Sequence, residues 1–190
     1  MDVSRVIERF QFCPRCGHSM IDASTAGTDA VRRVCSQPVC GYVQRTNPTP
    51  AIGALVEHNG DIILARNARW PQGWFALITG YLEAEEDPAA AVKREVKEEL
   101  NLDVVEITPI GNYIFEQKNE VMLCYHVIAN GEVTLSDELS EYRRYKPHEL
   151  RPWPRATGFA VAEWMNRRGL PFEFVASPGQ ESGTSGTSEA

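Results

Sequence analysis

Residues 80–102 read GYLEAEEDPAAAVKREVKEELNL, and this stretch predicts a loop that runs into an acidic helix. Asp87 and Pro88 are typical of a helix start, where an N-cap acceptor precedes a proline in the first turn. Most of the residues that follow are strong helix formers. The helix would carry three glutamates on one face, because they are spaced i, i+3 and i+4: Glu95, Glu98 and Glu99.

This acidic face has two interpretations. A solvated face is the ordinary explanation of a charge run, since three like charges on adjacent positions repel and do not stabilise a helix. A helix kept for solubility, however, would interleave lysines on that face, and Lys93 and Lys97 lie off it. The helix pattern alone leaves the solvated and the functional interpretation open.

The wider spacing resembles a known signature, the Nudix box G-x5-E-x7-R-E-U-x-E-E-x-G-U, in which U is aliphatic. Every fixed position matches except the last glycine, where this chain has Asn101. Asn is the next choice after Gly for the left-handed residue at a helix end. The chain is therefore similar to the Nudix hydrolases over residues 50–168, on these residues: Gly80, Glu86, Arg94, Glu95, Val96, Glu98, Glu99 and Leu102.

The resemblance implies an α/β (α+β) fold, the Nudix α/β/α sandwich with a mixed sheet. Periodicity alone indicates α+β. An Asn-Gly turn at residues 59–60 predicts a hairpin, and an apolar stripe over residues 157–168, ended by Gly169, predicts a closing helix. Apolar runs bounded by turn residues predict strands over residues 51–57, 61–66, 75–79, 103–117, 120–130, 132–135 and 142–145.

The resemblance also implies a metal-dependent hydrolase. Its reaction would cleave the diphosphate bond of a nucleoside diphosphate linked to another moiety, such as FAD, ADP-ribose or NAD(H), and release a nucleoside monophosphate. Hard carboxylate oxygens suit Mg²⁺ or Mn²⁺, which neutralises phosphate charge and acidifies water. By resemblance, Glu95 and Glu99 are metal ligands, and Glu98 shares the metal or deprotonates water. The backbone carbonyl of Thr79 would complete the shell.

Other residues have supporting or alternative roles by resemblance. Gly80, Glu86 and Arg94 are structural members of the box, and the last two form an ion pair that fastens the loop to the helix. A further base or ligand is expected from outside the box, and Glu141 and Glu120 are the candidates. Glu141 is favoured because its context resembles the later segment of the family. For each, the alternative is an exposed surface glutamate.

Residues 1–48 differ from the rest because they hold four cysteines in two close pairs: Cys13, Cys16, Cys35 and Cys40. Without a secretion signal, this spacing predicts a structural Zn²⁺ site rather than disulfides. Four thiolates close the tetrahedral shell and leave no position for catalysis. The alternatives are a reduced loop without metal, or His18 as a substitute ligand. The segment resembles the zinc ribbon that precedes the Nudix domain in the NADH pyrophosphatase group and in related FAD or ADP-ribose hydrolases.

Composition sets limits on the class of protein. A chain of 190 residues with 43% hydrophobic content suits one main domain with a small addition. We expect a zinc ribbon at 1–48, a Nudix domain at 49–170 and a disordered tail at 171–190 that is rich in Gly, Ser and Thr. The net charge of −7 makes nucleic acid an unexpected partner. No apolar run is long enough for a membrane span, so a cytoplasmic protein is expected.

The sequence does not choose the substrate. NADH pyrophosphatases carry an SQPWPFP-type motif shortly after the box, but residues 111–117 read GNYIFEQ here. We expect a small-molecule dinucleotide or nucleotide-sugar substrate, and a homodimer by analogy with ribbon-bearing relatives. The competing function is a non-catalytic nucleotide-sensing or RNA-binding module on a Nudix scaffold, and the intact acidic set favours the enzyme. The aromatics that could stack on a base, or simply pack in the core, are Trp70, Trp74, Tyr81, Tyr113 and Phe115.

Overall fold

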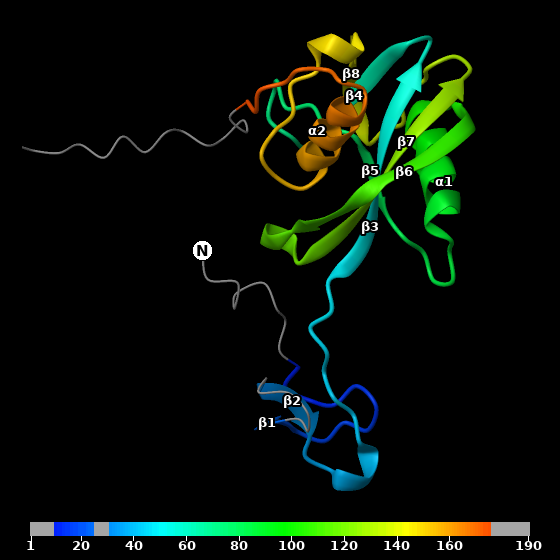
Figure 1. The fold of residues 1–190 in the computed structure, drawn as a ribbon. Helices are drawn as coiled ribbons and strands as arrows, with labels where there is room; N and C mark the ends of the chain where they lie inside the picture. Colours follow the sequence, from blue (N-terminus) through cyan, green and yellow to red (C-terminus); the bar gives the residue numbers. More distant parts are fainter. Residues whose placement is uncertain (1–9, 25–30, 176–190) are drawn as a thin grey trace, which may run out of the picture. The chain divides into compact units, whose positions relative to one another are not determined.

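The computed structural model describes residues 10–24 and 31–175 (Figure 1). Their contacts divide the chain into two compact units with a boundary after Thr49, and the short segment Glu116–Asn119 groups with the first unit. A backbone hydrogen bond of 2.9 Å from the Thr49 N–H to the Asn119 carbonyl contributes to that grouping.

The first unit is a small antiparallel ribbon. β1 (Met20–Ser24) pairs with β2 (Val31–Cys35), and a 3-10 turn, η2 (Pro38–Cys40), follows. Its buried side chains are few, namely Cys13, Met20 and Cys35, with Cys40 and Tyr42 packed against them. So small an apolar cluster is a weak source of stability.

The second unit contains a six-stranded sheet. The order is β6-β7-β3-β4-β8, and β5 pairs with β3. β3 and β7 run in the same direction in Figure 1, whereas β3 and β4 are antiparallel, so the sheet is mixed as expected. The strands are β3 (Thr49–His58), β4 (Asp61–Asn67), β5 (Ile78–Tyr81), β6 (Asp103–Phe115), β7 (Glu120–Asn130) and β8 (Leu139–Tyr145).

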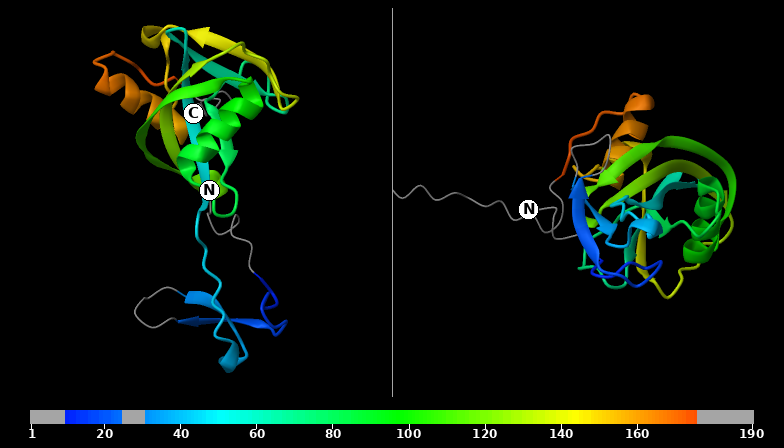
Figure 2. Two further views of the ribbon diagram at one scale, coloured as in Figure 1. Left: turned by 90° about the vertical axis from the view of Figure 1, so that its right-hand side faces the viewer. Right: turned by 90° about the horizontal axis from the view of Figure 1, so that it is seen from below.

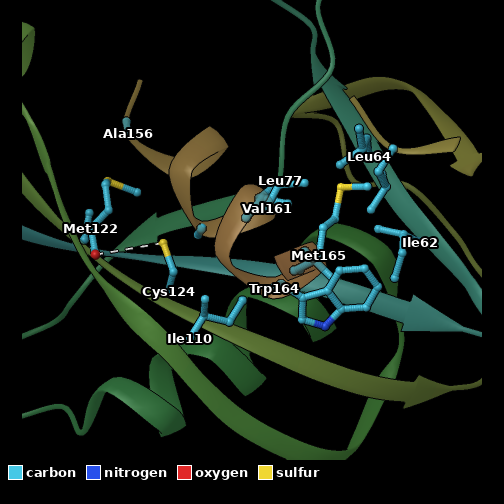
Figure 3. Packing of buried hydrophobic residues seen from close by; sticks show 14 residues of the cluster. Ile62, Leu64, Leu77, Ile110, Met122, Cys124, Ala156, Val161, Trp164 and Met165 are labelled. Atoms are coloured by element: carbon cyan, nitrogen blue, oxygen red, sulfur yellow. Dashed lines mark hydrogen bonds between the residues drawn. The ribbon is translucent and has the colours of Figure 1, made fainter. Parts of the chain in front are cut away.

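Two helices, α1 (Pro88–Leu100) and α2 (Thr157–Arg167), cover opposite faces of this sheet (Figure 2). The alternation of side chains in β3 explains both layers. Ile52 and Val56 pack with α1, whereas Leu55 packs with α2. Figure 3 shows the core on the α2 side, where Trp164 and Met165 lie among residues of β4 and β6. The α/β/α sandwich is therefore confirmed.

Local signals are confirmed at several turns and helix ends. The Asp87 side chain accepts hydrogen bonds from the N–H groups of Ala89 (2.9 Å) and Ala90 (3.2 Å), so it caps α1. Asn101 ends that helix in the left-handed region, with φ 58°. In the β3–β4 hairpin, Asn59 and Gly60 have φ of 55° and 79°, as an Asn-Gly turn requires.

Three strand predictions need correction. Residues 132–135 form no strand, because the N–H of Thr134 donates to the Leu100 carbonyl (3.0 Å) and satisfies the end of α1 instead. β5 begins at Ile78 rather than at residue 75, since Ala76 forms only an isolated bridge with β4. β8 begins at Leu139, three residues before the predicted start.

The closing helix and the tail also differ in part from the prediction. The stripe of α2 is buried except for Phe159, which is 40% exposed and lies 5.9 Å, ring to ring, from Phe174. Residues 171–175, the first part of the predicted tail, belong to the described chain, and the Val175 N–H donates to the Pro152 carbonyl (2.9 Å). The rest of the predicted tail, 176–190, lies outside the described residues. No helix in the described part of the chain is long and apolar enough to cross a membrane.

Candidate active site

Helix α1 presents the three box glutamates in different environments. The Glu95 side chain is 13% exposed and that of Glu98 is 59% exposed. Glu99 is buried, with 9% of its surface exposed. Arg94 Nη1 donates to Glu95 (2.7 Å) and to Glu98 (3.1 Å), so both carboxylates are held by one guanidinium. The Glu99 carboxyl group has no hydrogen bond or ion pair within residues 10–24 and 31–175.

Arg94 also connects the helix to the loop before it. Its Nε and Nη2 donate to the two Glu86 oxygens (2.8 and 2.9 Å), and Nη2 donates to the Tyr81 carbonyl (3.1 Å). These bonds lower the pKa of Glu86 to about 2. Glu86 in turn accepts from the Glu83 N–H (3.0 Å), which holds the loop in place. The geometry is that of the ion pair expected from the box.

The box glycine leaves room for the Glu95 side chain. A Cβ atom built on Gly80 would overlap the carboxylate of Glu95. Gly80 lies in β5 opposite Ile52, beside Thr79, which pairs with Gly53. The strand and the helix are thus close together where Gly80 faces Glu95.

Burial and like charge raise the pKa of two carboxyl groups. For Glu99, burial is the largest cause, and the charges of Glu95, Glu138 and Glu98 add to it, so its pKa reaches about 8. Burial also raises the pKa of Glu95, although Arg94 opposes this. The site therefore has more negative charge than the protein itself neutralises.

Glu138 is a further acidic residue near the box glutamates that the sequence did not indicate. Its charge acts on both Glu95 and Glu99. Its loop is tied to the end of α1, because the Ser136 N–H donates to the Glu99 carbonyl (3.1 Å). The Glu138 N–H donates to Ser136 Oγ (3.3 Å), and its carbonyl accepts from the Ala68 N–H (2.8 Å). No motif in the sequence predicts where this loop lies, because its position depends on backbone hydrogen bonds to a helix that is distant in the sequence.

Glu141 and Glu120, the two candidates for an additional base or metal ligand, each contact other side chains. Glu141, on β8, accepts from Arg143 Nε and Nη2 (both 3.2 Å) and lies 3.5 Å from Arg66 Nε. Glu120 is buried at the start of β7 and accepts from the Tyr81 hydroxyl (2.6 Å). Both roles remain predictions, and Glu138 becomes a third candidate.

The donor set fits a divalent cation. Mg²⁺ and Mn²⁺ prefer hard carboxylate oxygens. A buried Glu99 surrounded by like charges is costly unless a cation neutralises it. As the structure places them, the box carboxylates are not close enough together to share an ion. They could hold one if Glu95 and Glu98 turned away from Arg94. Thr79 would add its carbonyl.

Comparison with known families agrees with this geometry. A family model described as the NUDIX domain matches residues 47–165. The chain belongs to the Nudix family.

Curated relatives extend the match into the ribbon. The chain is 28% identical over 169 residues to the "NAD-capped RNA hydrolase NudC" of Pseudomonas putida (strain W619), covering 85% of this chain and 58% of that protein. It is 28% identical over 152 residues to the protein of the same description from Pseudomonas aeruginosa (strain LESB58), covering 79% and 52%. The chain thus spans just over half the length of the curated relatives it matches.

Solved structures support the fold. A NUDIX hydrolase from Nitrosomonas europaea superposes with a TM-score of 0.67 at 22% identity, covering 88% of this chain and 99% of that one. The MutT protein from Methanosarcina mazei Go1 gives a TM-score of 0.53 at 21% identity, covering 67% and 100%. At such identities the likeness concerns architecture.

The ribbon that precedes this Nudix domain brings its four cysteines together. The Sγ atoms of Cys13 and Cys40 lie 3.7 Å apart and those of Cys16 and Cys35 lie 3.4 Å apart, and all four lie within 4.8 Å of one another. A tetrahedral zinc ion with Zn–S bonds of about 2.3 Å separates its sulfurs by roughly 3.8 Å. A disulfide would need about 2.05 Å. The geometry therefore fits Zn²⁺.

Two turns build this cluster. Cys13 and Cys16 flank a turn closed by the Gly17 N–H to the Cys13 carbonyl (2.8 Å), and Gly17 has φ 75°. Gly41, with φ 62°, follows Cys40 in the same way. Among the described residues, this is the one group of three or more His, Cys, Asp or Glu close enough to share an ion. His18 is not part of it and contacts the Cys16 carbonyl (3.3 Å).

Proposed function

We propose that this protein is a Nudix pyrophosphohydrolase that uses Mg²⁺ or Mn²⁺ to cleave the diphosphate bond of a nucleoside diphosphate linked to another moiety. FAD, ADP-ribose and NAD(H)-like compounds are the substrate class, and a nucleoside monophosphate is released. Membership of the Nudix family supports the reaction class.

One observation supports this function above the others. Glu99 is buried, its pKa is raised to about 8 by burial and by Glu95, Glu138 and Glu98, and the described chain supplies it with no cation. A helix built only for stability would not place a carboxyl group at a buried position among other carboxylates, where its ionisation is costly. Such a site is suited to a divalent ion.

We assign each acidic residue a role in this reaction. When bound, the ion would neutralise diphosphate charge and lower the pKa of water. Glu95 and Glu99 would hold it, with the Thr79 carbonyl and Glu138 adding oxygen ligands. Glu98 is the most exposed of the box glutamates, so it is suited to accept the proton of the attacking water.

Arg94 keeps the acidic side chains in place through its bonds to the loop and helix. Glu141 remains the other proposed base, but its contacts with Arg66 and Arg143 suit a positioning role.

The test is an activity panel. FAD, ADP-ribose, NADH and diadenosine compounds are each incubated with Mg²⁺ or Mn²⁺, and nucleoside monophosphate release is measured. Glu99→Gln should lower kcat by about 10²–10⁴-fold. Glu163→Gln is the matched control, since Glu163 lies on α2 in an ion pair with Arg167. Equal, slow release by wild type and Glu99→Gln from every substrate would contradict the proposal.

A second candidate substrate is NAD-capped RNA. It is favoured by the printed names of relatives that are 28% identical to this chain. A capped RNA carries the same kind of diphosphate bond, so the acidic site would serve both substrates. This candidate opposes our expectation from net charge that nucleic acid is not a partner. Adding a short NAD-capped RNA to the panel, with the uncapped RNA as control, separates the two.

The non-catalytic alternative makes a different prediction. A nucleotide-sensing or RNA-binding module would bind ligand without turnover, and substituting the box glutamates would leave binding unchanged.

We further propose that Zn²⁺ has a structural role in the ribbon. The protein would work in the cytoplasm, where zinc-bound thiolates stay reduced. We also propose that it forms a homodimer. Light scattering coupled to size-exclusion chromatography tests the last point.

A further inference from the structure

The small sheet of the first unit has two unlike faces. In the pairing of β1 with β2, Met20 lies opposite Cys35 and Ile21 lies opposite Val34. Because successive side chains of a strand point to opposite faces, these two pairs belong to different faces. Met20 and Cys35 are buried on the side of the cysteine cluster, whereas Ile21 is 49% exposed. The ribbon therefore has an apolar face that its own small core does not cover.

Two phenylalanines extend this face on the side of β1. Phe12 forms an antiparallel bridge with Ser19, and the same register brings Phe10 beside Ile21. Phe12 is 64% exposed and Phe10 is 37% exposed, although both carry large apolar rings. Aromatic rings that are exposed on a sheet face are surfaces on which unpaired bases stack.

Two arginines lie on the same face beyond β2. Val34 of β2 forms an antiparallel bridge with Val43. Arg32 precedes Val34 by two residues and Arg45 follows Val43 by two, so both arginines belong to the face of the valines and to the same end of it. Arg45 is exposed and Arg32 is half-buried.

Neither of these arginines is paired with an acidic group. The side chains of Arg32 and Arg45 form no hydrogen bond and no ion pair within residues 10–24 and 31–175. Arg33, on the other face, differs from them, because its Nη2 donates to the Phe10 carbonyl (3.0 Å) and its Nη1 lies 3.7 Å from Asp22. Like charges on neighbouring strands repel each other, and a bound anion relieves that repulsion. The two unpaired guanidinium groups are therefore suited to phosphates.

Single-stranded RNA is the ligand that matches both features of this face. It supplies flat bases that stack on aromatic rings and phosphates that pair with arginines. An apolar protein partner would leave the two arginines uncompensated. An inorganic anion would leave the phenylalanine rings exposed to water.

We infer that the apolar face of the ribbon binds single-stranded RNA through Phe10, Phe12, Ile21, Arg32 and Arg45. Bases stack on the two phenylalanine rings, and phosphates accept hydrogen bonds from the two arginines. This site goes beyond the proposed function, because binding to it requires neither the diphosphate bond nor a divalent ion. It supports the capped-RNA candidate, since that substrate carries an RNA chain.

The test is fluorescence anisotropy of a short, uncapped, labelled oligouridylate with the full chain, with its zinc retained and without added Mg²⁺ or Mn²⁺. Phe12→Ala should weaken binding about tenfold, because a base loses its stacking partner. Arg32→Gln and Arg45→Gln should each weaken binding and reduce the dependence of log K on log salt concentration by about 0.7, because one phosphate contact is lost. The matched controls are Val39→Ala, an exposed apolar position in the turn η2, and Arg69→Gln, an exposed arginine of the second unit. Both controls should bind like wild type.

Several results would overturn the inference. They are the absence of measurable RNA binding by wild type, or equal affinity and equal salt dependence in wild type, Phe12→Ala, Arg32→Gln and Arg45→Gln. If these variants change the oligomeric state in light scattering but not the RNA affinity, the face is an interface with a second copy of the chain, and the inference is wrong.

These outcomes are distinguishable from those of the activity panel. The expected losses support the RNA site even if no compound of the panel is hydrolysed, and a failure to bind RNA overturns the site even if the enzyme is active. Zinc content checks the folding of each variant. If Phe12→Ala loses its zinc, Phe12→Leu replaces it, because leucine keeps the apolar volume without a ring.

Discussion

The charge of Glu138 raises the pKa of Glu99, and the loop that carries Glu138 is hydrogen-bonded to the Glu99 carbonyl through the Ser136 N–H. One loop thus completes the last turn of α1 and places a carboxylate near its buried glutamate. A helix with unsatisfied carbonyls needs such partners. Here the same backbone contacts that end the helix also extend the acidic site beyond the box.

Glu138 should therefore matter more than Glu141. We expect Glu138→Gln to lower kcat by about 10²-fold and to weaken Mn²⁺ binding, since a metal-site oxygen and a negative charge are lost. Glu141→Gln should have an effect of less than about tenfold, because Arg66 and Arg143 already hold that carboxylate. Steady-state kinetics over a Mn²⁺ titration measures both. The reverse order of effects would restore Glu141 as the base.

The sequence predicts what depends on local signals. The Asp87 cap, the left-handed Asn101 and the Asn-Gly hairpin were all predictable because each is encoded in a few neighbouring residues. The spacing of the box predicts which glutamates share a helix face. The continuous apolar run in β3 agrees with a strand that is covered by a helix on each face.

Features that depend on tertiary contacts were not predictable. Residues 132–135 have a strand-like composition, but the Thr134 N–H donates to the Leu100 carbonyl at the end of α1. The sequence does not distinguish Glu138 from other loop glutamates, because only the folded structure brings its loop to α1. The sequence context of Glu141 favours it as the additional base. That context does not predict that Arg66 and Arg143 both form ion pairs with it in the folded protein.

The substitution Gly80→Ala tests whether the position of Glu95 depends on the missing side chain at Gly80 in β5. A Cβ there would overlap the end of the flexible Glu95 side chain, which can move, so Gly80→Ala should leave the free energy of unfolding within about 1 kcal/mol of wild type. Displacing Glu95 should nevertheless weaken Mn²⁺ binding and lower kcat by about 10–100-fold.

Gly53→Ala is the matched control for this substitution. Its Cβ would lie 3.0 Å from Cys124 Sγ and 3.1 Å from Thr157 Cγ2, so it crowds the core between β3 and α2. We expect it to destabilise the fold by about 1–3 kcal/mol without changing Mn²⁺ affinity. If both variants show the same pattern in denaturant titration and metal binding, Gly80 has no special relation to Glu95.

The ribbon should contain about one zinc ion per chain, bound by its four cysteines. Cys16→Ser should lose that zinc, and limited proteolysis should then cleave the first unit, because its small core depends on the ion. Metal analysis by mass spectrometry gives the stoichiometry. A folded, protease-resistant ribbon without metal would contradict the zinc assignment.

Cys124 offers the control within the same chain. It is buried in the second unit, and burial raises the pKa of its thiol to about 12, so it should not react with thiol reagents in the folded protein. Cys124→Ser should keep its zinc. After chelation, four thiols should react in wild type and three in Cys16→Ser.

His126 should make the stability of the second unit depend on pH. It is 8% exposed, its Nε2 lies 2.8 Å from Glu57 of β3, and its ring lies 5.5 Å from that of Trp164 in α2. Burial lowers the pKa of His126. Glu57 and Glu106 of β6 oppose that shift, whereas Arg168 after α2 adds to it. The folded protein therefore keeps His126 neutral below its ordinary pKa of about 6.5.

The direction of the pH effect follows from proton binding. Below about pH 6.5 the unfolded chain takes up a proton at His126 that the folded chain does not, so stability is complete above this pH and falls as the pH drops toward the lower folded pKa. Between pH 7.5 and 5, the free energy of unfolding should fall further in wild type than in His126→Gln, whose amide can still donate to Glu57. Denaturant titrations at the two pH values measure this, with His148→Gln, at an exposed position in the 3-10 turn η4 (Pro147–Glu149), as control. Equal losses in wild type and His126→Gln would mean that His126 binds its proton equally well in both states.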